Sequence, residues 1–259
     1  MKFYEMPWPE LAKVDREQTL ILAPVGACEQ HGPHLPTFTD SLTAAAIAEG
    51  IEAQLPGRVL LLPVMWLGAS EHHLPFGATL TARVETHITL LTELVRPLLA
   101  DGYRRLFFLN AHGGNIDTIN VTLRRLQQEY PEVLLTAAGY WDLAEKEIAA
   151  ICESPQTSPL HACEVETSII LALRPDLVRD VKLVDYDEPA DDALRGLHIT
   201  RDMAQSTRDG HVGYPSYGTA EKGEQFLKVI IGCAAKICGA ILQTPLPVTR
   251  TPAKEMQTP

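Results

Sequence analysis

The chain has 259 residues, a formal net charge of -11 and a sequence pI of about 5.3. Hydrophobic residues make up 46% and charged residues 21%, which indicates a folded chain with one large core rather than a disordered one. The acidic balance argues against nucleic acid or an anionic membrane as a partner, because both attract clustered Lys and Arg. We expect one domain over residues 1–243 and a Pro/Thr-rich tail over residues 244–259.

The N-terminal segment MKFYEMPWPEL carries acids and prolines where a signal peptide would have an apolar core. We also identify no apolar run approaching the roughly 20 residues that span a bilayer. A cytoplasmic location without a membrane partner is therefore expected. The five cysteines are scattered and form no CxxC pair, so neither a disulfide framework nor a thiolate zinc site is expected.

Strand-like and helix-like segments alternate along the chain. Continuous apolar runs predict buried strands at residues 19–25, 58–65, 105–110 and 133–138. Amphipathic or Ala-rich stretches predict helices at residues 40–54, 86–100, 116–129, 164–173 and 219–242. Residues 176–217 are less regular, with acids, Gly and Pro throughout. This order predicts an α/β fold, a Rossmann-like three-layer α/β/α sandwich with a mostly parallel sheet, whose ligand sites lie at the carboxyl ends of the strands.

The loop after the first predicted strand concentrates carboxylates and imidazoles. It runs from Glu29 to Asp40 and reads EQHGPHLPTFTD. Glu29 and His31 are two residues apart, so an extended segment points both side chains to one side. Carboxylate oxygen and neutral imidazole are the usual ligands of Zn²⁺ and Mn²⁺. We therefore expect a metal site here, the alternative being a solvated surface loop.

The next two strand ends carry further candidates. The third strand ends in NAHGGN, which offers His112 as a ligand and Gly113 and Gly114 as points of close backbone approach. A phosphate-binding interpretation is weak, because neither GxGxxG nor a Walker pattern is present. The second strand is followed by GASEHH, in which Ser70 and His73 are candidates for the substrate pocket.

A third motif, HACEVETS, begins at His161 and opens the helix predicted over residues 164–173. His161 and Glu164 are three residues apart and share a helix face, whereas Glu166 projects elsewhere. Both glutamates also suit a first turn, where the helix dipole favours acids. The spacing leaves open which glutamate completes a metal site. Apolar residues on the Glu166 side favour Glu166 as the inward one: Ile169, Ile170 and Leu173.

Taken together, these motifs resemble the creatininase family of amidohydrolases over nearly the whole chain. Two late elements belong to the same resemblance, Gly213-Tyr214-Pro215 and Glu221-Lys222-Gly223-Glu224. The resemblance implies a Rossmann-like sandwich and a binuclear centre with two divalent ions per subunit, Zn²⁺ or Mn²⁺ or both, with Fe²⁺ as a further candidate. It also implies a homo-oligomer, a hexamer built as a trimer of dimers.

The resemblance assigns metal-ligand roles position by position. Glu29 and His31 resemble ligands to different metals, Asp40 resembles the bridging carboxylate, and His112 resembles a further terminal ligand. Creatinine-hydrolysing members place a glutamate two residues after that histidine, where this chain has Gly114.

Relatives with HGGN instead use the glutamate of the later E-T-S motif, which makes Glu166 the expected fifth ligand. His161 resembles the catalytic histidine of the family. A second departure concerns the Trp-Asp pair that creatinine-hydrolysing enzymes carry just before this histidine, which is Thr157 and Ser158 here. We therefore do not expect creatinine itself as the substrate, unless another ring replaces the lost one: Tyr140, Trp141 or Trp66.

The sequence thus predicts an amidohydrolase that cleaves a C–N amide-type bond, in a cyclic amide or a formamide, with a water activated by two metals and His161 moving protons. Its partner would be a small-molecule substrate. Alternatives within the enzymes are a deformylase of a pyrimidine nucleotide precursor, a lactam or lactone hydrolase, a small peptidase, and a cysteine hydrolase using Cys28 with His31 or His34. A non-catalytic metal- or nucleotide-binding protein is the alternative outside them.

Overall fold

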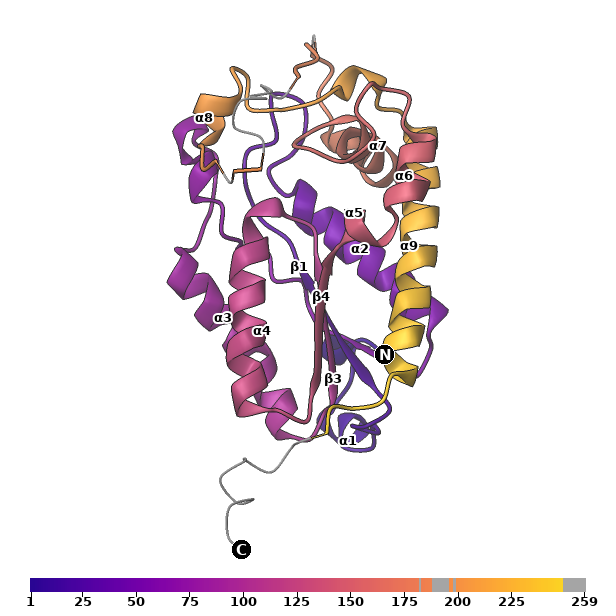
Figure 1. Cartoon of the computed structure of the whole chain (residues 1–259). Coiled ribbons are helices and arrows are strands. Elements are labelled where there is room, and N and C mark those ends of the chain that lie inside the picture. Colours follow the sequence, from indigo (N-terminus) through magenta and orange to yellow (C-terminus); the bar gives the residue numbers. More distant parts are fainter. Residues whose placement is uncertain (182, 188–195, 198, 249–259) are drawn as a thin grey trace, which may run out of the picture.

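A four-stranded parallel sheet lies at the centre of the computed structural model, which describes residues 1–181, 183–187, 196–197 and 199–248 (Figure 1). The strand order is β2-β1-β3-β4, and every neighbouring pair is parallel. The strands are β1 (Leu20–Val25), β2 (Val59–Leu61), β3 (Arg105–Asn110) and β4 (Leu134–Gly139). The predicted α/β fold with a mostly parallel sheet is therefore confirmed.

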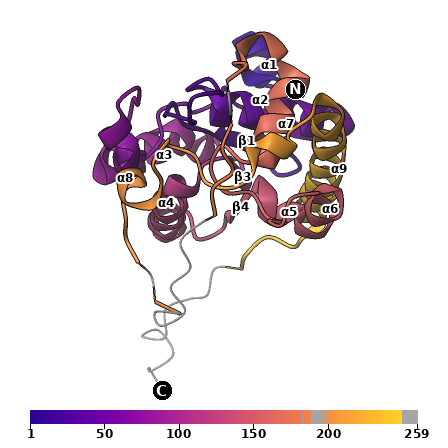
Figure 2. The ribbon, with the colours of Figure 1, turned by 90° about the horizontal axis from the view of Figure 1, so that it is seen from above.

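Helices cover both faces of the sheet (Figures 1 and 2). One face is covered by α3 (Val84–Ala100) and α4 (Ile116–Glu129). The other face is covered by α2 (Thr39–Gln54) and α9 (Ala220–Gln243), next to which lie α5 (Tyr140–Leu143), α6 (Glu145–Ile151) and α7 (Glu164–Leu173). Shorter helices are α1 (Trp8–Leu11), α8 (Met203–Ser206), η1 (Phe3–Glu5), η2 (Glu71–Phe76), η3 (Gly113–Asn115), η4 (Pro175–Leu177) and η6 (Pro215–Tyr217).

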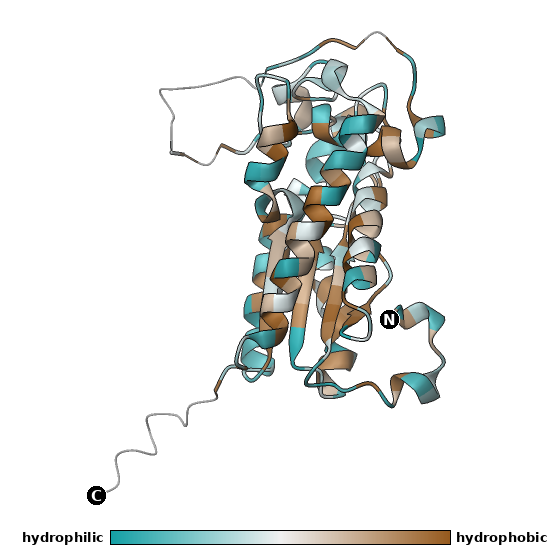
Figure 3. Ribbon diagram, turned by 90° about the vertical axis from the view of Figure 1, so that its right-hand side faces the viewer, coloured by the Kyte–Doolittle hydropathy of each residue, from teal (hydrophilic) through white to brown (hydrophobic). Residues whose placement is uncertain are grey.

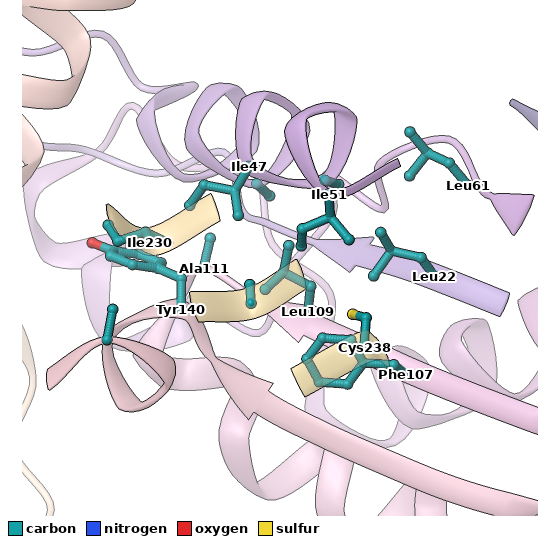
Figure 4. Close-up of a cluster of buried hydrophobic side chains, with 14 of the residues drawn as sticks. Leu22, Ile47, Ile51, Leu61, Phe107, Leu109, Ala111, Tyr140, Ile230 and Cys238 are labelled. Carbon is teal, nitrogen blue, oxygen red and sulfur yellow. The ribbon is translucent and has the colours of Figure 1, made fainter. Parts of the chain in front are cut away.

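Alternation along the buried strands divides the core in two. Leu22 and Phe107 point toward α2 and α9, whereas their neighbours Ile21 and Phe108 point toward α3 and α4. Figure 4 shows the first cluster, where Ile230 of α9 lies among side chains from the sheet and from α2. A strand buried on both faces needs apolar residues at every position, which is why β1 reads as one continuous apolar run.

One helix differs from the sequence-based expectation about apolar runs. Among the described residues, α9 alone is long and apolar enough by composition to cross a membrane, with a mean hydropathy of 1.7. It packs against α7 so closely that a Cβ on Gly223 would lie 1.9 Å from the carbonyl oxygen of Ser168. The helices facing the viewer in Figure 3 carry hydrophilic as well as hydrophobic residues, with apolar strands behind them. A helix of a protein core can have the same length and apolar composition as a membrane span.

Two other expectations need adjustment. The strand expected over residues 58–65 ends at Leu61, because Pro63 has no N–H to donate to the sheet, and pairing resumes only where Val25 meets Met65. The region 176–217 was expected to be irregular and contains the helix α8. Residues 249–259 of the predicted tail lie outside the described residues. The start of that tail is anchored, since the Arg105 guanidinium donates to the carbonyl of Thr244 at 2.9 Å.

The topology creates one special point at the carboxyl edge of the sheet. From β1 the chain crosses to β2 on one side, and it then returns to β3 on the other side of β1. The loops that leave β1 and β3 therefore diverge and open a crevice between them, the usual ligand position in sheets of order 2-1-3-4. The register pairs Val25 with Asn110, so the segments that follow them begin side by side.

Candidate metal centre

The loop after β1 delivers three candidate ligands. Its path is held where Glu29 donates its backbone N–H to the carbonyl of Thr37 at 2.8 Å. Asp40 is the second residue of α2, where the helix dipole favours a carboxylate. The side chains of Glu29, His31 and Asp40 are each at most 3% exposed. The motif read from the sequence is thus a buried group of charges rather than a solvated loop.

The loop after β3 carries the fourth candidate ligand, His112. Asn110 brackets this turn, because its side chain donates to the His112 carbonyl at 2.7 Å and accepts the His112 N–H at 3.1 Å. Asn115 fixes the turn to the neighbouring loops by donating to the carbonyl of Gly26 and accepting from the N–H of Ala69. His112 is thereby held at the crevice between β1 and β3.

Asp40 lies between the histidines of the two loops. One of its oxygens is 3.0 Å from His31 Nε2, and the other is 3.4 Å from His112 Nδ1. His112 Nδ1 is also 3.1 Å from a Glu29 oxygen. Ligand atoms of Glu29, Asp40 and His112 lie within 4.8 Å of one another, and those of His31, Asp40 and Glu166 form a second such group; a third combines Glu29 and His31 with His161. The first two groups share Asp40.

The structure distinguishes the two glutamates of α7. Glu166 belongs to the second ligand group, and one of its oxygens accepts the N–H of Ala162 at 2.5 Å. Glu164 is two residues earlier, about 200° away around the helix. Its carboxylate contacts the ammonium of Lys222 at 2.7 Å and accepts backbone N–H groups of Glu153 and Ser154. Glu166 is therefore placed as the fifth candidate ligand, and Glu164 is occupied elsewhere.

Hydrogen bonds fix which nitrogen of each histidine faces the carboxylates. His31 Nδ1 lies 3.1 Å from the carbonyl of Glu29, and His112 Nε2 lies 3.3 Å from the carbonyl of Ala69. A carbonyl only accepts, so these nitrogens carry a proton, and the opposite nitrogens face the carboxylates, where each takes up either a second proton or a metal ion. Bare nitrogens and carboxylate oxygens repel one another unless a cation or a proton lies between them.

The carboxylate oxygens of the cluster also need a cation or a proton beside them. Both oxygens of Glu29 and Oδ2 of Asp40 are buried, and ring nitrogens of histidines are the only polar groups that the described residues place beside them, which is costly for charged groups unless those rings are protonated or a cation is bound. Burial alone lowers the pKa of His31 and His112, but Asp40 and Glu29 respectively outweigh it and raise these pKa values to about 10 and about 9. Burial and the neighbouring carboxylate of Asp40 raise the pKa of Glu166. The donor set of carboxylates and imidazoles therefore fits divalent cations such as Zn²⁺ or Mn²⁺.

His161 lies beside this cluster. Its Nε2 donates to the carbonyl of Gln30 at 2.8 Å, which leaves Nδ1 bare and 3.8 Å from a Glu29 oxygen. Burial, with further contributions from His31 and His73, lowers the pKa of His161 well below its usual value. The imidazole is therefore neutral, and its bare nitrogen is positioned to accept a proton at the cluster.

A cavity of about 310 Å³ opens over the cluster. Of the four expected substrate-binding residues, His73, Gly113 and Gly114 line it, whereas Ser70 is buried behind His112, with its Oγ 3.3 Å from His112 Nε2. Of the possible replacement rings, Trp141 lines the cavity. Tyr140 is in the hydrophobic core and Trp66 is 42% exposed away from the cavity lining.

The segment that replaces the Trp-Asp pair of creatinine-hydrolysing enzymes does not face the cluster. Thr157 and Ser158 are absent from the described lining of the cavity, which is formed here by Pro159 and Leu160. Ser158 contributes instead to a separate surface hollow.

Sequence reasoning assigned no role to two parts of this site. Gln30 donates its side-chain amide to His73 Nδ1 at 2.9 Å, and its carbonyl holds His161. Gln30 lies between the predicted ligands Glu29 and His31 in the sequence, and this position could have identified it as part of the site. Met203 and Ser206 of α8 also line the cavity, and no motif marked this short helix.

Cys28 does not have the surroundings of a nucleophile. Its sulfur lies 3.9 Å from Thr37 Oγ1, and it does not line the described cavity. His34, one of its two proposed partners, contacts Thr167 through Nε2 at 2.9 Å. His31, the other, faces Asp40.

Known proteins share this architecture and align with most of the length of the chain. Mycofactocin precursor peptide peptidase of Mycobacterium ulcerans is 30% identical over 226 residues, covering 84% of both chains. Creatinine amidohydrolase of Pseudomonas putida is 29% identical over 263 residues, covering 92% of this chain and 94% of that protein. A crystal structure of creatinine amidohydrolase (creatininase) superposes with a TM-score of 0.78 and 25% identity, covering 94% of this chain and 98% of that one.

The sequence model of the family described as "Creatininase: Creatinine amidohydrolase" matches residues 4–238, nearly the whole chain. The match includes the loop after β1, the turn after β3 and the start of α7. The chain therefore belongs to the creatininase family and is a hydrolase of that family.

Proposed function

We propose that this hydrolase uses two divalent metal ions, Zn²⁺ or Mn²⁺ with Fe²⁺ as a further candidate, to hydrolyse a C–N amide-type bond in a small molecule. The observation that carries the proposal is the pair of ligand groups that share Asp40. Two dications at adjacent sites repel each other, and a carboxylate with one oxygen toward each group offsets that repulsion. Structures of creatininases with the same fold include a manganese form and a Zn–Zn form.

In this proposal Glu29 and His112 would hold one ion, His31 and Glu166 would hold the other, and Asp40 would serve both. Bound divalent ions polarise a carbonyl and make water a better nucleophile at neutral pH.

The remaining chemistry falls to His161. Its bare Nδ1 accepts the proton of the attacking water and then donates it to the leaving nitrogen. The Gln30 carbonyl keeps the other ring proton on Nε2, so that Nδ1 stays available.

Peptide hydrolysis is the second candidate. It is favoured by the mycofactocin precursor peptide peptidases, which are 30–31% identical to this chain. The lining beside His161 is Pro159 and Leu160 rather than the Trp-Asp pair, but Trp141 offers a ring in the same cavity, so creatinine remains a substrate to be tested.

A hydrolysis screen with and without a chelator tests the proposal. Metal-loaded protein is given formamides, lactams, lactones, short peptides and creatinine, and product is followed by mass spectrometry. We expect turnover of an amide that a chelator abolishes and added Zn²⁺ or Mn²⁺ restores. Turnover that survives the chelator but is blocked by a thiol reagent would contradict the proposal, as would turnover of lactones alone.

We also propose a cytoplasmic homo-oligomer, a hexamer, on the strength of family membership. Sedimentation velocity at micromolar concentrations tests this assembly. A mass near 28.5 kDa throughout would contradict it.

A further inference from the structure

The lining of the catalytic cavity has two unlike parts. One part is the cluster of carboxylates and imidazoles around Asp40. The rest is largely apolar and comes from chain segments far apart in the sequence, namely Trp141 after β4, Leu160 before His161, Met203 of α8 and Val212. A substrate bound at the cluster must therefore place some part of itself against apolar side chains.

The helix α8 is fixed next to this cavity. It packs against η2, which contributes His73 to the same lining (Figures 1 and 2). A capping box starts the helix, because the Asp202 carboxylate accepts the Gln205 N–H at 2.9 Å and the Gln205 side chain accepts the Asp202 N–H at 3.0 Å. Met203 follows directly and is only 9% exposed. Ser206 lies one turn further along and lines the cavity as well.

Hydrogen bonds connect the chain beyond α8 to His161. Thr207 donates its hydroxyl to the carbonyl of His211 at 2.6 Å and so closes the turn after the helix. Val212 then donates its N–H to the carbonyl of His161 at 2.8 Å. Met203 is therefore positioned relative to His161 by a short, hydrogen-bonded path, as a residue that contacts the substrate needs to be.

Charge limits what this cavity accepts. No lysine or arginine occurs among the described residues that line it, and its carboxylates belong to the ligand groups. An anionic substituent placed against Met203, Leu160 and Val212 would lose its hydration and meet no described cation there.

We propose that Met203 is a specificity-determining residue, and that the cavity selects amides whose substituent beside the scissile bond is apolar and uncharged. This inference rests on the proposed function, since it concerns the substrate of the same site. It disfavours substrates that carry phosphate or carboxylate close to the amide, and with them the deformylation of a nucleotide precursor.

A binding experiment tests the inference without turnover. Hydroxamates chelate metal ions and carry the substituent of the corresponding amide. Isothermal titration of zinc-loaded protein would compare acetohydroxamate, hexanohydroxamate and the monohydroxamate of adipic acid, whose chain ends in a carboxylate. We expect hexanohydroxamate to bind at least tenfold more tightly than either of the others. Equal binding of the alkyl and carboxylate compounds would overturn the proposal, as would a failure of all three to bind.

Three variants assign the effect to Met203. Met203→Gln keeps the length of the side chain but makes it polar, and should bring the preference of hexanohydroxamate over acetohydroxamate to within about threefold. Met203→Leu should retain the preference. Ala204→Met is the matched control, because it adds a methionine at an exposed position of the same helix and should change nothing. An unchanged preference in Met203→Gln, or a loss in Ala204→Met, would overturn the assignment.

Turnover separates this inference from the proposed function. If amides are hydrolysed at equal rates with apolar and anionic substituents, the inference fails and the proposed function stands. If the hydroxamates show the expected order but no amide is hydrolysed, the proposed function fails and the apolar subsite stands.

Discussion

Two groups of buried charges lie on different sides of the first turn of α7, and they are balanced in different ways. Glu164 is paired with Lys222 and receives two backbone N–H groups, so its charge is neutralised by the protein itself. Glu166 lies with Asp40 and Glu29 among histidines, and no lysine or arginine is bonded to it in the described structure. Buried charge must be compensated. The group around Glu164 therefore stabilises the fold, whereas the group around Glu166 needs bound cations.

Predictions that separate the two groups start with Asp40. Asp40→Ala should remove both ions and lower amide hydrolysis to background, because both ligand groups lose a member at once. Elemental analysis and an activity assay measure this. Asp117→Ala is the matched control, since Asp117 is an exposed acid in the first turn of α4. Retention of both ions in Asp40→Ala would mean that this residue does not join the two groups.

His161→Ala should lower the rate about 10²- to 10⁴-fold, the usual contribution of general acid–base catalysis, while both ions remain. Metal content and kcat are measured on the same preparation. Because His161 Nδ1 lies within reach of Glu29 and His31, loss of one ion is the outcome that would make His161 a ligand.

Glu166→Gln should remove or weaken one ion of the two and leave the other in place, because Glu166 belongs to one ligand group only. Titration with Zn²⁺ in the presence of a competing chelator would resolve one strong and one weakened site. Two undisturbed sites would contradict the placement of Glu166.

Lys222→Met should destabilise the fold by about 3–5 kcal/mol, because it leaves Glu164 buried without its partner. The metal content should stay that of the parent protein. Urea unfolding measures the first effect and elemental analysis the second. Lys228→Met, at an exposed position of the same helix, is the control. The double variant Lys222→Met with Glu164→Leu should recover most of the stability, and a double variant no better than the single one would refute the pairing.

The smallest expected effect is a pH dependence of metal binding. In the metal-free protein the pKa values of His31 and His112 are raised to about 10 and about 9, so both rings are protonated near pH 7. A metal ion must displace these protons, so affinity should rise with pH until the pH exceeds both values. Calorimetry at pH 7.5 in buffers of different ionisation enthalpy should detect a release of one to two protons per chain. No proton release would contradict the positions given to these two histidines.

The sequence predicted the fold and most of the candidate site for identifiable physical reasons. The strands β1 and β3 are buried on both faces and read as continuous apolar runs, and their polar residues follow directly at the carboxyl edge. Candidate ligands that lie on short loops after such strands, such as His31 and His112, can therefore be proposed from the sequence.

Other features depend on contacts between segments far apart in the chain. Helical periodicity puts Glu164 and Glu166 on different faces of α7. Only the packing of α9 on α7 shows that Lys222 forms an ion pair with Glu164. The helix α8 has four residues in a polar stretch, and its capping box alone does not reveal that Met203 reaches the cavity. The early end of β2 at Leu61 is different, because Pro63 is visible in the sequence and could have marked it.

The central claim is that the buried carboxylates without a protein cation hold two divalent ions that share Asp40. Anomalous diffraction from crystals of metal-replete protein, collected above and below the absorption edge of the bound metal, tests it most directly. We predict two peaks about 3.5–4 Å apart with Asp40 between them, the first beside Glu29 and His112 and the second beside His31 and Glu166. A single peak, or no peak, in crystals of protein prepared with excess Zn²⁺ and Mn²⁺ would contradict the claim.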